Sequence, residues 1–200
     1  MEIVTDEEAR AVLFRTLCGI CPLPASEWQF LSDQVRRERF SRGEQLVSCG
    51  AEARAIWLML SGVVRFFYSS ADGRESNKAF ARSGELIGPL VAVVTNQPCG
   101  FAIEALESVD SLAIPTAILP MLYERHHSWD RIGRVLAEQA LARKEIRERE
   151  FLLDDPLARY RCFLTRYPGI ERQIPQKQIA SYIGISEVSL SRLLRRERQR

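Results

Sequence analysis

Residues 175–196 contain the pattern that most restricts the fold of this chain, because they predict two short helices joined by a tight turn. Ile179 and Ile183 lie one helical turn apart and therefore share a face. Gly184 can adopt the positive φ that ends a helix, and Ser186 can cap the helix that follows. The inward stripe of that second helix comprises Leu190, Leu193 and Leu194. This spacing is typical of a helix-turn-helix, with a purely structural helical hairpin as the alternative.

Positive charge is concentrated in the same part of the chain. Residues 171–200 hold seven Arg or Lys against three Glu, a net charge of +4, whereas the rest of the chain has a net charge of −2. A basic recognition helix is the expected footprint of a surface that contacts phosphate, so we predict DNA binding. The residues expected to face DNA are Gln176, Lys177, Ser186, Glu187, Val188, Ser189, Ser191, Arg192, Arg195 and Arg196.

These residues have different expected roles. Gln176 and Lys177 begin the first helix, where side chains and free backbone amides can face phosphate. Arg192 is the favoured base reader, because its guanidinium can pair bidentately with guanine. Ser189 lies one turn from Arg192, and the methyl groups of Val188 can meet a thymine methyl.

Composition gives only general limits. A hydrophobic content of 46% and a charged content of 27% are ordinary for a soluble globular protein. The longest apolar run, 86–94, contains Gly88 and Pro89 and is too short to span a bilayer. The acidic N-terminus does not resemble a secretory signal. We therefore expect a cytoplasmic protein without membrane contact, whose five cysteines are reduced thiols.

The region from residue 40 to residue 114 is divided by glycines into pieces of strand length. Segments 56–60 and 63–68 are rich in β-forming residues, and Asp72-Gly73 predicts a hairpin turn before a strand that ends near Phe80. Further strands are expected over 101–106 and 109–114, and helices over 6–18 and 25–37. The predicted fold class is α+β, with an N-terminal antiparallel, jelly-roll-like β-roll followed by helices.

Helical spacing returns after residue 115. A short helix is expected over 116–124 and a long one over 128–153, whose apolar side is consistent with a helix–helix dimer seam or with packing on its own domain. Asp155 can cap the next helix and Pro156 can begin it, which marks a hinge. The expected domains are 1–114, 115–153 and 154–200. The seam residues are Ile132, Val135, Leu136, Gln139, Ala142 and Ile146.

The succession of a β-roll, a long helix, an Asp-Pro hinge and a helix-turn-helix resembles the Crp/Fnr family of bacterial transcription regulators. The matching motifs are RGE at 42–44, SGVV at 61–64, DGRE at 72–75, GELIG at 84–88 and the segment 174–192. The resemblance implies a cyclic-nucleotide-binding-like roll, a homodimer built on the long helix, and a palindromic operator in double-stranded DNA. RNA polymerase is a further partner that it implies. Because the sequence stops at residue 200, we do not expect the full β-wing that family members commonly carry.

The ligand pocket implied by the resemblance departs from that of cyclic-nucleotide-binding members. Those members contact the ribose through a glutamate after a glycine, and hold the cyclic phosphate with an Arg-Ser or Arg-Thr pair. Here Pro89 follows Gly88, and the loop 96–101 contains no arginine. A buried phosphate without a cationic partner is costly, so we expect an unknown small-molecule effector or none, rather than cAMP or cGMP. The expected pocket residues are Gly88, Pro89, Leu90, Cys99, Gly100 and Phe101.

The cysteines allow one alternative. Cys18 and Cys21 resemble the N-terminal iron–sulfur ligands of oxygen-sensing family members, and Cys49 and Cys99 could complete a set of four. An iron–sulfur or redox sensor is therefore an alternative to buried or incidental thiols. We expect no cofactor and no metal.

An enzyme is not expected. Metal chemistry on a β-roll needs several histidines on its strands, whereas His126 and His127 are adjacent at a helix junction and are expected to point in different directions. No catalytic residues are predicted, because neither a Gly-rich phosphate loop nor a nucleophile–His–acid set is visible. The remaining alternative is a cyclic-nucleotide-type sensor module that regulates a protein partner.

Overall fold

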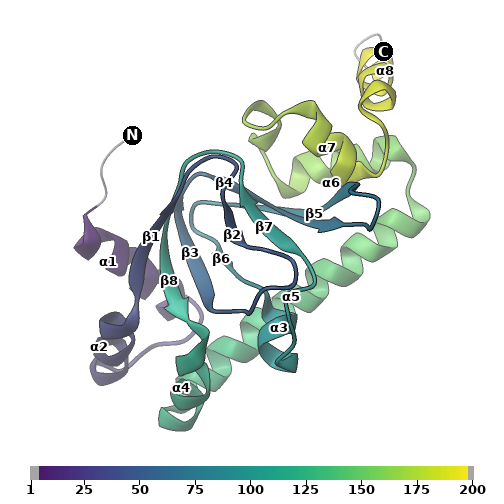
Figure 1. The fold of residues 1–200 in the computed structure, drawn as a ribbon. Coiled ribbons are helices and arrows are strands. Elements are labelled where there is room, and N and C mark those ends of the chain that lie inside the picture. The colour runs from purple at the N-terminus through teal and green to yellow at the C-terminus, as the bar shows by residue number, and fades with distance from the viewer. Residues whose placement is uncertain (1–4, 198–200) are drawn as a thin grey trace. The chain divides into compact units, whose positions relative to one another are not determined.

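The computed structural model describes residues 5–197, which form two compact units (Figure 1). The first unit comprises the chain up to Arg65 together with Ala81–Gln139. The second comprises Phe66–Phe80 together with the chain from Ala140 onward. This division differs from the three predicted segments, because it groups a hairpin segment with the C-terminal helices and divides the long helix after Gln139.

Two helices begin the described chain. Helix α1 spans Asp6–Cys18, and Thr5 caps it through a reciprocal pair of hydrogen bonds with Glu8. Helix α2 spans Ala25–Gln34 and ends earlier than predicted. The backbone becomes extended at Val35, and the next residues pair with a strand, so the expected helix over residues 35–37 is wrong.

Within the described residues 5–197, eight strands form two four-stranded sheets (Figure 1). The strands are β1 (Arg36–Phe40), β2 (Gln45–Val47), β3 (Ala55–Ser61), β4 (Val63–Ser69), β5 (Glu75–Arg82), β6 (Leu86–Ile87), β7 (Ala102–Ala105) and β8 (Val109–Pro115). Their orders are β1-β8-β3-β6 and β2-β7-β4-β5. The predicted antiparallel, jelly-roll-like fold followed by helices is confirmed.

Glycine is required at the turn between β3 and β4. Gly62 has φ +84°, and a β-carbon there would come within 2.4 Å of the Ser108 carbonyl oxygen. The predicted Asp72-Gly73 turn joins β4 to β5, where the Ser70 N–H donates to the Arg74 carbonyl at 2.9 Å. Both turns are local features that the glycine positions indicate.

The remaining helices are α3 (Leu90–Thr95), the 3-10 turn η1 (Thr116–Ile118), α4 (Leu119–Arg125), α5 (His127–Leu153), α6 (Pro156–Arg166), the 3-10 turn η2 (Ile170–Arg172), α7 (Gln176–Ile183) and α8 (Glu187–Glu197). The long helix agrees closely with the expected range 128–153. Asp155 Oδ1 accepts a hydrogen bond from the Ala158 N–H at 2.9 Å, which confirms the predicted cap before Pro156. None of the helices within residues 5–197 is both long and apolar enough to cross a membrane.

The core of the first unit joins its helices to one sheet. Leu13 and Leu31 from α1 and α2 are buried with Leu58 and Leu112 from β3 and β8, and Trp129 of α5 completes the cluster. Burial of a large aliphatic side chain stabilises a fold by about 1.5–3 kcal/mol, so these contacts fix the helices on the sheet.

The second unit has an aromatic core. Phe80 packs against Phe163, Tyr167 and Tyr182 at ring-centroid distances of 6.0, 5.6 and 5.7 Å. Phe163 and Tyr182 are fully buried. These contacts connect the end of the hairpin segment with α6 and α7 within one compact unit.

Candidate nucleic-acid interface

The turn between α7 and α8 has the geometry that the sequence predicts. Gly184 has φ +82° and ψ +36°, and its N–H donates to the Ala180 carbonyl at 2.9 Å. The Ile185 N–H donates to the same carbonyl at 3.1 Å. These bonds satisfy carbonyls at the end of α7, so the chain can reverse abruptly into the next helix.

Ser186 caps α8 as predicted. Its Oγ accepts a hydrogen bond from the Ser189 N–H at 3.1 Å and lies 2.8 Å from the Ser189 Oγ. Leu190 is fully buried, and Ile179 and Ile183 of α7 are buried as well. The two helices therefore pack through the predicted apolar stripe and leave the other side of α8 to solvent.

All residues predicted to face DNA are exposed. They are Gln176, Lys177, Ser186, Glu187, Val188, Ser189, Ser191, Arg192, Arg195 and Arg196. Their exposure is compatible with the predicted contacts, but the roles assigned to individual residues stay predictions.

The exposed face of α8 has two edges. Ser189, Arg192 and Arg196 line a groove together with Pro156 and Leu157 at the start of α6. The other edge contains Val188, Ser191 and Arg195. Arg192 and Arg196 thus lie at the groove beside α6, whereas Arg195 is not among the residues that line it.

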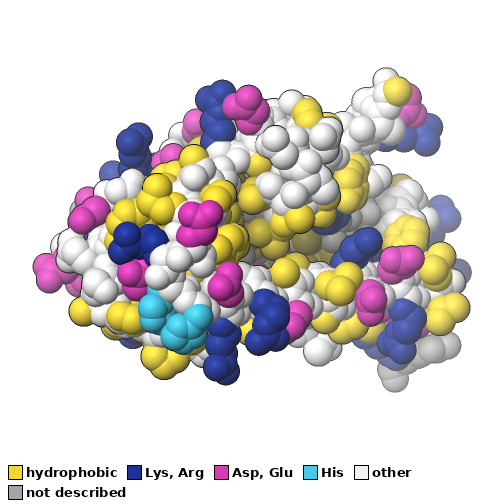
Figure 2. All heavy atoms as spheres, turned by 90° about the horizontal axis from the view of Figure 1, so that it is seen from below, with side chains coloured by type: hydrophobic (Ala, Val, Ile, Leu, Met, Phe, Trp, Pro, Cys, Tyr) yellow, Lys and Arg dark blue, Asp and Glu magenta, His cyan; other side chains and the backbone are white. Residues whose placement is uncertain are grey.

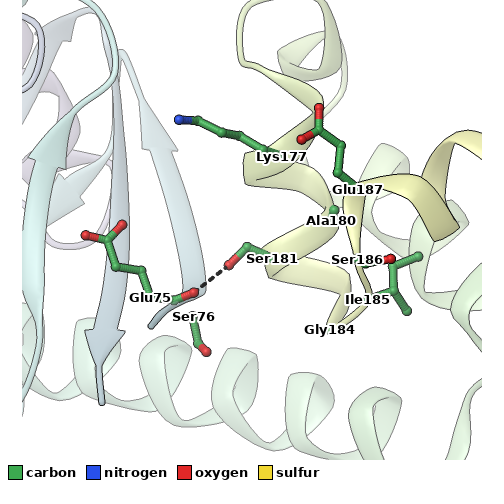
Figure 3. A pocket seen from close by; sticks show the side chains of 9 residues that line it. All are labelled: Glu75, Ser76, Lys177, Ala180, Ser181, Gly184, Ile185, Ser186 and Glu187. Carbon is green, nitrogen blue, oxygen red and sulfur yellow. Dashed lines mark hydrogen bonds between the residues drawn. The ribbon is translucent and has the colours of Figure 1, made fainter. Parts of the chain in front are cut away.

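A second cleft lies between β5 and the helix-turn-helix, within the same unit (Figure 3). Lys177 of α7, Glu187 of α8 and Glu75 of β5 are among the residues that line it. The Ser181 hydroxyl donates to the Glu75 carbonyl at 3.2 Å, as the dashed line in Figure 3 marks. The cleft thus combines the predicted phosphate-contacting lysine with two carboxylates.

A buried ion pair between α5 and α6 contacts α7 through Tyr182. Arg166 of α6 donates to both carboxylate oxygens of Glu150, at 3.0 and 2.5 Å, and to the Tyr182 hydroxyl at 2.5 Å. Burial by itself would lower the pKa of Arg166, but the hydrogen bonds to Glu150 and Tyr182 outweigh it and raise the pKa above its usual range. Glu150 is 4% exposed, so the pair is largely shielded from water.

Arg147 of α5 adds a second contact to the same helix. It donates to the Tyr182 carbonyl, and its guanidinium carbon lies 4.1 Å from the centroid of the Tyr182 ring. Burial lowers the pKa of Arg147. The C-terminal half of α5 therefore holds α7 through polar and aromatic contacts.

The predicted dimer seam is only partly available on the surface. Ile132 is 5% exposed and belongs to the core of its own unit, so the prediction that it lies in an open seam is corrected. Val135 is half-buried, and Leu136 packs against that same core. The remaining seam residues Gln139, Ala142 and Ile146 are exposed.

The predicted effector residues surround a short helix in the first unit. Gly88 and Pro89 precede α3, which begins at Leu90. Cys99 and Phe101 are 1% and 7% exposed, whereas Gly100 is exposed. Burial raises the pKa of the Cys99 thiol, and the nearby Cys49 raises it further. A buried thiol with a raised pKa cannot replace the missing arginine as a phosphate partner. These residues remain a predicted pocket.

The cysteines do not form a cluster site within residues 5–197. No group of three or more His, Cys, Asp or Glu side chains in this range is arranged to hold a metal ion. Cys49 and Cys99 lie on neighbouring segments, because the Gly50 N–H donates to the Cys99 carbonyl at 2.7 Å. Cys18 is half-buried and Cys21 is buried.

The two histidines correct one expectation. Their ring centroids are 4.2 Å apart with an interplanar angle of 37°, so the rings lie against each other instead of pointing in different directions. Figure 2 shows them as one cyan patch on the surface. The backbone bends at His126, where α4 ends and α5 follows, which brings the rings together.

Sequence reasoning missed Asn77, Gln178 and the Arg166–Glu150 pair. Gln178 is 7% exposed on a helix whose other buried residues are Ile179, Ala180, Tyr182 and Ile183. A polar residue on the inner side of a helix signals a buried partner, but its spacing cannot identify Asn77 or place it one hundred residues earlier in the sequence.

Comparison with known proteins finds a matching domain family and a partial relative. Residues 37–126 match the cyclic nucleotide-binding domain family. The fumarate and nitrate reduction regulatory protein of Vibrio cholerae serotype O1 is 31% identical over 104 residues, which are 52% of this chain and 41% of that protein. The match therefore spans less than half of that relative.

Two solved structures share the fold. FixK2 from Bradyrhizobium japonicum has a TM-score of 0.73 at 16% identity, covering 82% of this chain and 85% of that chain. A transcriptional regulator of the Crp/Fnr family from Eubacterium rectale has a TM-score of 0.72 at 18% identity, covering 86% of this chain and 82% of that chain. The fold is thus a cyclic nucleotide-binding-type roll followed by a helix-turn-helix. In its fold the chain is similar to regulators of the Crp/Fnr family.

Proposed function

We propose that the protein is a homodimeric, sequence-specific DNA-binding regulator of transcription that acts in the cytoplasm. Its helix-turn-helix reads a palindromic operator in double-stranded DNA, and its β-roll responds to a small-molecule effector. The family relatives are named as regulators rather than enzymes, which supports a non-catalytic role. RNA polymerase is a further partner in this proposal.

The observation that carries the proposal is the exposed face of α8. Arg192, Arg195 and Arg196 are all exposed on a helix that is packed through Leu190 on its opposite side. Arginine can pair with phosphate or bidentately with guanine, so a rigid helix carrying three of them is suited to the major groove. The turn at Gly184 and the cap at Ser186 fix the direction of this helix.

The proposed homodimer forms through α5. Gln139, Ala142 and Ile146 are spaced by three and four residues, which is the spacing of a coiled-coil seam. Continuing this spacing passes Arg149 and reaches Leu153. Ile146 and Leu153 are 48% and 77% exposed. Apolar side chains this exposed along one side of a long helix are well suited to a second copy of the same helix.

The effector of this proposal is not a cyclic nucleotide. Pro89 has no carboxylate for a ribose, and the loop before β7 contains Cys99 where a cationic partner would be needed. Calorimetry with cAMP and cGMP at micromolar concentrations should therefore give no measurable binding. A tight, stoichiometric complex would show that the pocket uses other donors.

A mobility-shift experiment with fragmented genomic DNA tests DNA binding directly. The purified protein should retain a small subset of fragments in the presence of excess unrelated DNA, and the retained fragments should share a palindrome. A sensor module that regulates only a protein partner would retain none. Uniform retention of all fragments would contradict sequence-specific reading.

A further inference from the structure

A buried polar contact joins β5 to the first helix of the motif. Asn77 is 5% exposed, and its side-chain amide donates to the Gln178 carbonyl at 2.9 Å and to the Gln178 side-chain oxygen at 2.7 Å. Its backbone N–H donates to the Ser181 hydroxyl at 3.0 Å. The Ser181 hydroxyl in turn donates to the Glu75 carbonyl (Figure 3). We call the set Glu75, Asn77, Gln178 and Ser181 the polar clasp.

Aromatic packing supports the polar clasp three residues further along β5. The Phe80 ring contacts Tyr167 edge to face, and its backbone N–H donates to the Tyr167 hydroxyl at 3.3 Å. The same ring packs against Tyr182, which lies one turn along α7 from Gln178. The polar clasp and the aromatic packing of Phe80 thus lie next to each other, and together they hold α7 against the segment Phe66–Phe80.

The polar clasp is sensitive to small changes. A buried amide that loses its partner costs about 1–3 kcal/mol, whereas an exposed one recovers its hydrogen bonds with water. Asn77 and Gln178 are both nearly inaccessible to water, so their bonds favour one arrangement of β5 and α7. Contacts of this kind specify a position more strongly than apolar packing alone.

The polar clasp does not involve the side chains that are predicted to contact DNA. Gln178 and Ser181 lie on the side of α7 that faces β5, whereas Gln176 and Lys177 are exposed. The α8 residues Val188 and Arg192 are exposed as well. The clasp therefore does not occupy the predicted DNA surface and is compatible with a bound operator.

We propose that Asn77 is a positioning residue for DNA binding, which fixes the helix-turn-helix on β5 so that the two reading heads of a dimer keep one separation. This inference rests on the proposed function. A dimeric reader requires its recognition helices to match the spacing of two half-sites. A clasp on each protomer sets that spacing, and its loss lets each head rotate and tolerate other spacings.

The experiment compares Asn77→Ala and the nearly isosteric Asn77→Asp with Ser76→Ala as the matched control. Ser76 is the neighbouring exposed residue of β5, and it lines the cleft in Figure 3 without belonging to the clasp. The Asp variant keeps the size of the side chain, and its ionised carboxylate cannot donate to the Gln178 oxygens. Both Asn77 variants should increase amide hydrogen exchange in residues 176–183 by about tenfold, whereas Ser76→Ala should not.

The second measurement titrates the dimer of the 200-residue chain against a selected operator. The comparison operators have one base pair added or removed between half-sites. Wild-type protein and Ser76→Ala should bind one spacing about tenfold or more tightly than the others. The Asn77 variants should lose affinity for the best spacing, retain non-specific binding, and discriminate less among spacings. A purely structural role would lower binding to every spacing alike.

The hydrogen-exchange measurement and the half-site spacing titration distinguish a failure of the proposed role of Asn77 from a failure of the proposed function. Wild-type protein that retains no DNA fragment would contradict the proposed function, while the exchange measurement would still decide whether the clasp holds α7. If folded Asn77→Asp protein exchanges like wild type in 176–183, or keeps the wild-type preference for one spacing, the positioning role of Asn77 is wrong.

Discussion

The ring of Phe151 lies so close to Gly184 that a β-carbon on the glycine would come within 2.7 Å of the ring. Phe151 belongs to the last turns of α5, and Gly184 is the turn residue of the helix-turn-helix. Arg147 and Arg159 lie over the same ring at 5.2 and 5.1 Å from its centroid. Gly184 therefore serves two purposes: it permits the left-handed turn, and it leaves room for Phe151.

Replacing Gly184 by alanine tests both purposes. The left-handed conformation costs a non-glycine residue about 1–2 kcal/mol, and the contact with Phe151 adds to this. Gly73→Ala is the matched control, because Gly73 has φ +80° but nothing within 4 Å of its β-carbon position. Denaturant unfolding should show a larger loss for Gly184→Ala. Equal losses would mean that Phe151 does not restrict the turn.

Stability of the first unit should depend on the ionisation of Glu27. Hydrogen bonds from Arg125 and Trp129 lower the pKa of this carboxyl, against the effect of burial. Because the pKa is lower in the folded state than its unfolded value of about 4.3, the stabilisation is present above that value and is lost as the pH falls through the folded pKa.

The variant Glu27→Gln isolates this contribution. Its free energy of unfolding should be lower than that of wild type at pH 7, and the difference should shrink between about pH 5 and pH 3. Chemical denaturation at several pH values measures both quantities. A difference that stays constant down to pH 3 would show that the ionised carboxylate is not what Arg125 and Trp129 recognise.

The dimer seam is tested on exposed residues of α5. Ile146→Glu places a charge in the proposed seam and should give monomers in light scattering at tens of micromolar, where wild type should be dimeric. Leu141→Glu is the control, because Leu141 is 56% exposed but lies five residues away, on another side of the helix. Monomeric wild-type protein, or dissociation by both variants, would contradict this seam.

Local signals predicted much of the fold. The cap at Asp155, the left-handed Gly184 and the cap at Ser186 depend on neighbouring residues, so a short stretch of sequence was sufficient to find them. The strands β3, β4, β5, β7 and β8 followed from β-forming residues and glycine turns, whereas the short β6 was not predicted. Periodicity was less informative for Ile132, because an apolar stripe does not distinguish packing on its own unit from packing on a partner.

Contacts between distant polar residues could not be predicted. Nothing in the sequence near Asn77 indicates Gln178 as its partner, and the Arg166–Glu150 pair requires α5 and α6 to be placed first. The exposed face of α8 was easier to predict from the sequence, because its outward residues lie opposite the leucine stripe. The role of each outward residue depends on DNA, which neither the sequence nor the fold contains.

In the proposed complex the motif reads bases through Arg192 and contacts phosphate through Lys177. The direct measurement is a titration of Arg192→Ala and Lys177→Ala against a selected operator and unrelated DNA across a range of salt concentrations. Arg192→Ala should lose about 2–6 kcal/mol of specific binding in a palindromic complex, while binding to unrelated DNA stays largely intact. Lys177→Ala should weaken binding to all sequences alike and flatten the salt dependence. Equal, sequence-independent losses for both variants would contradict this account of the reading face.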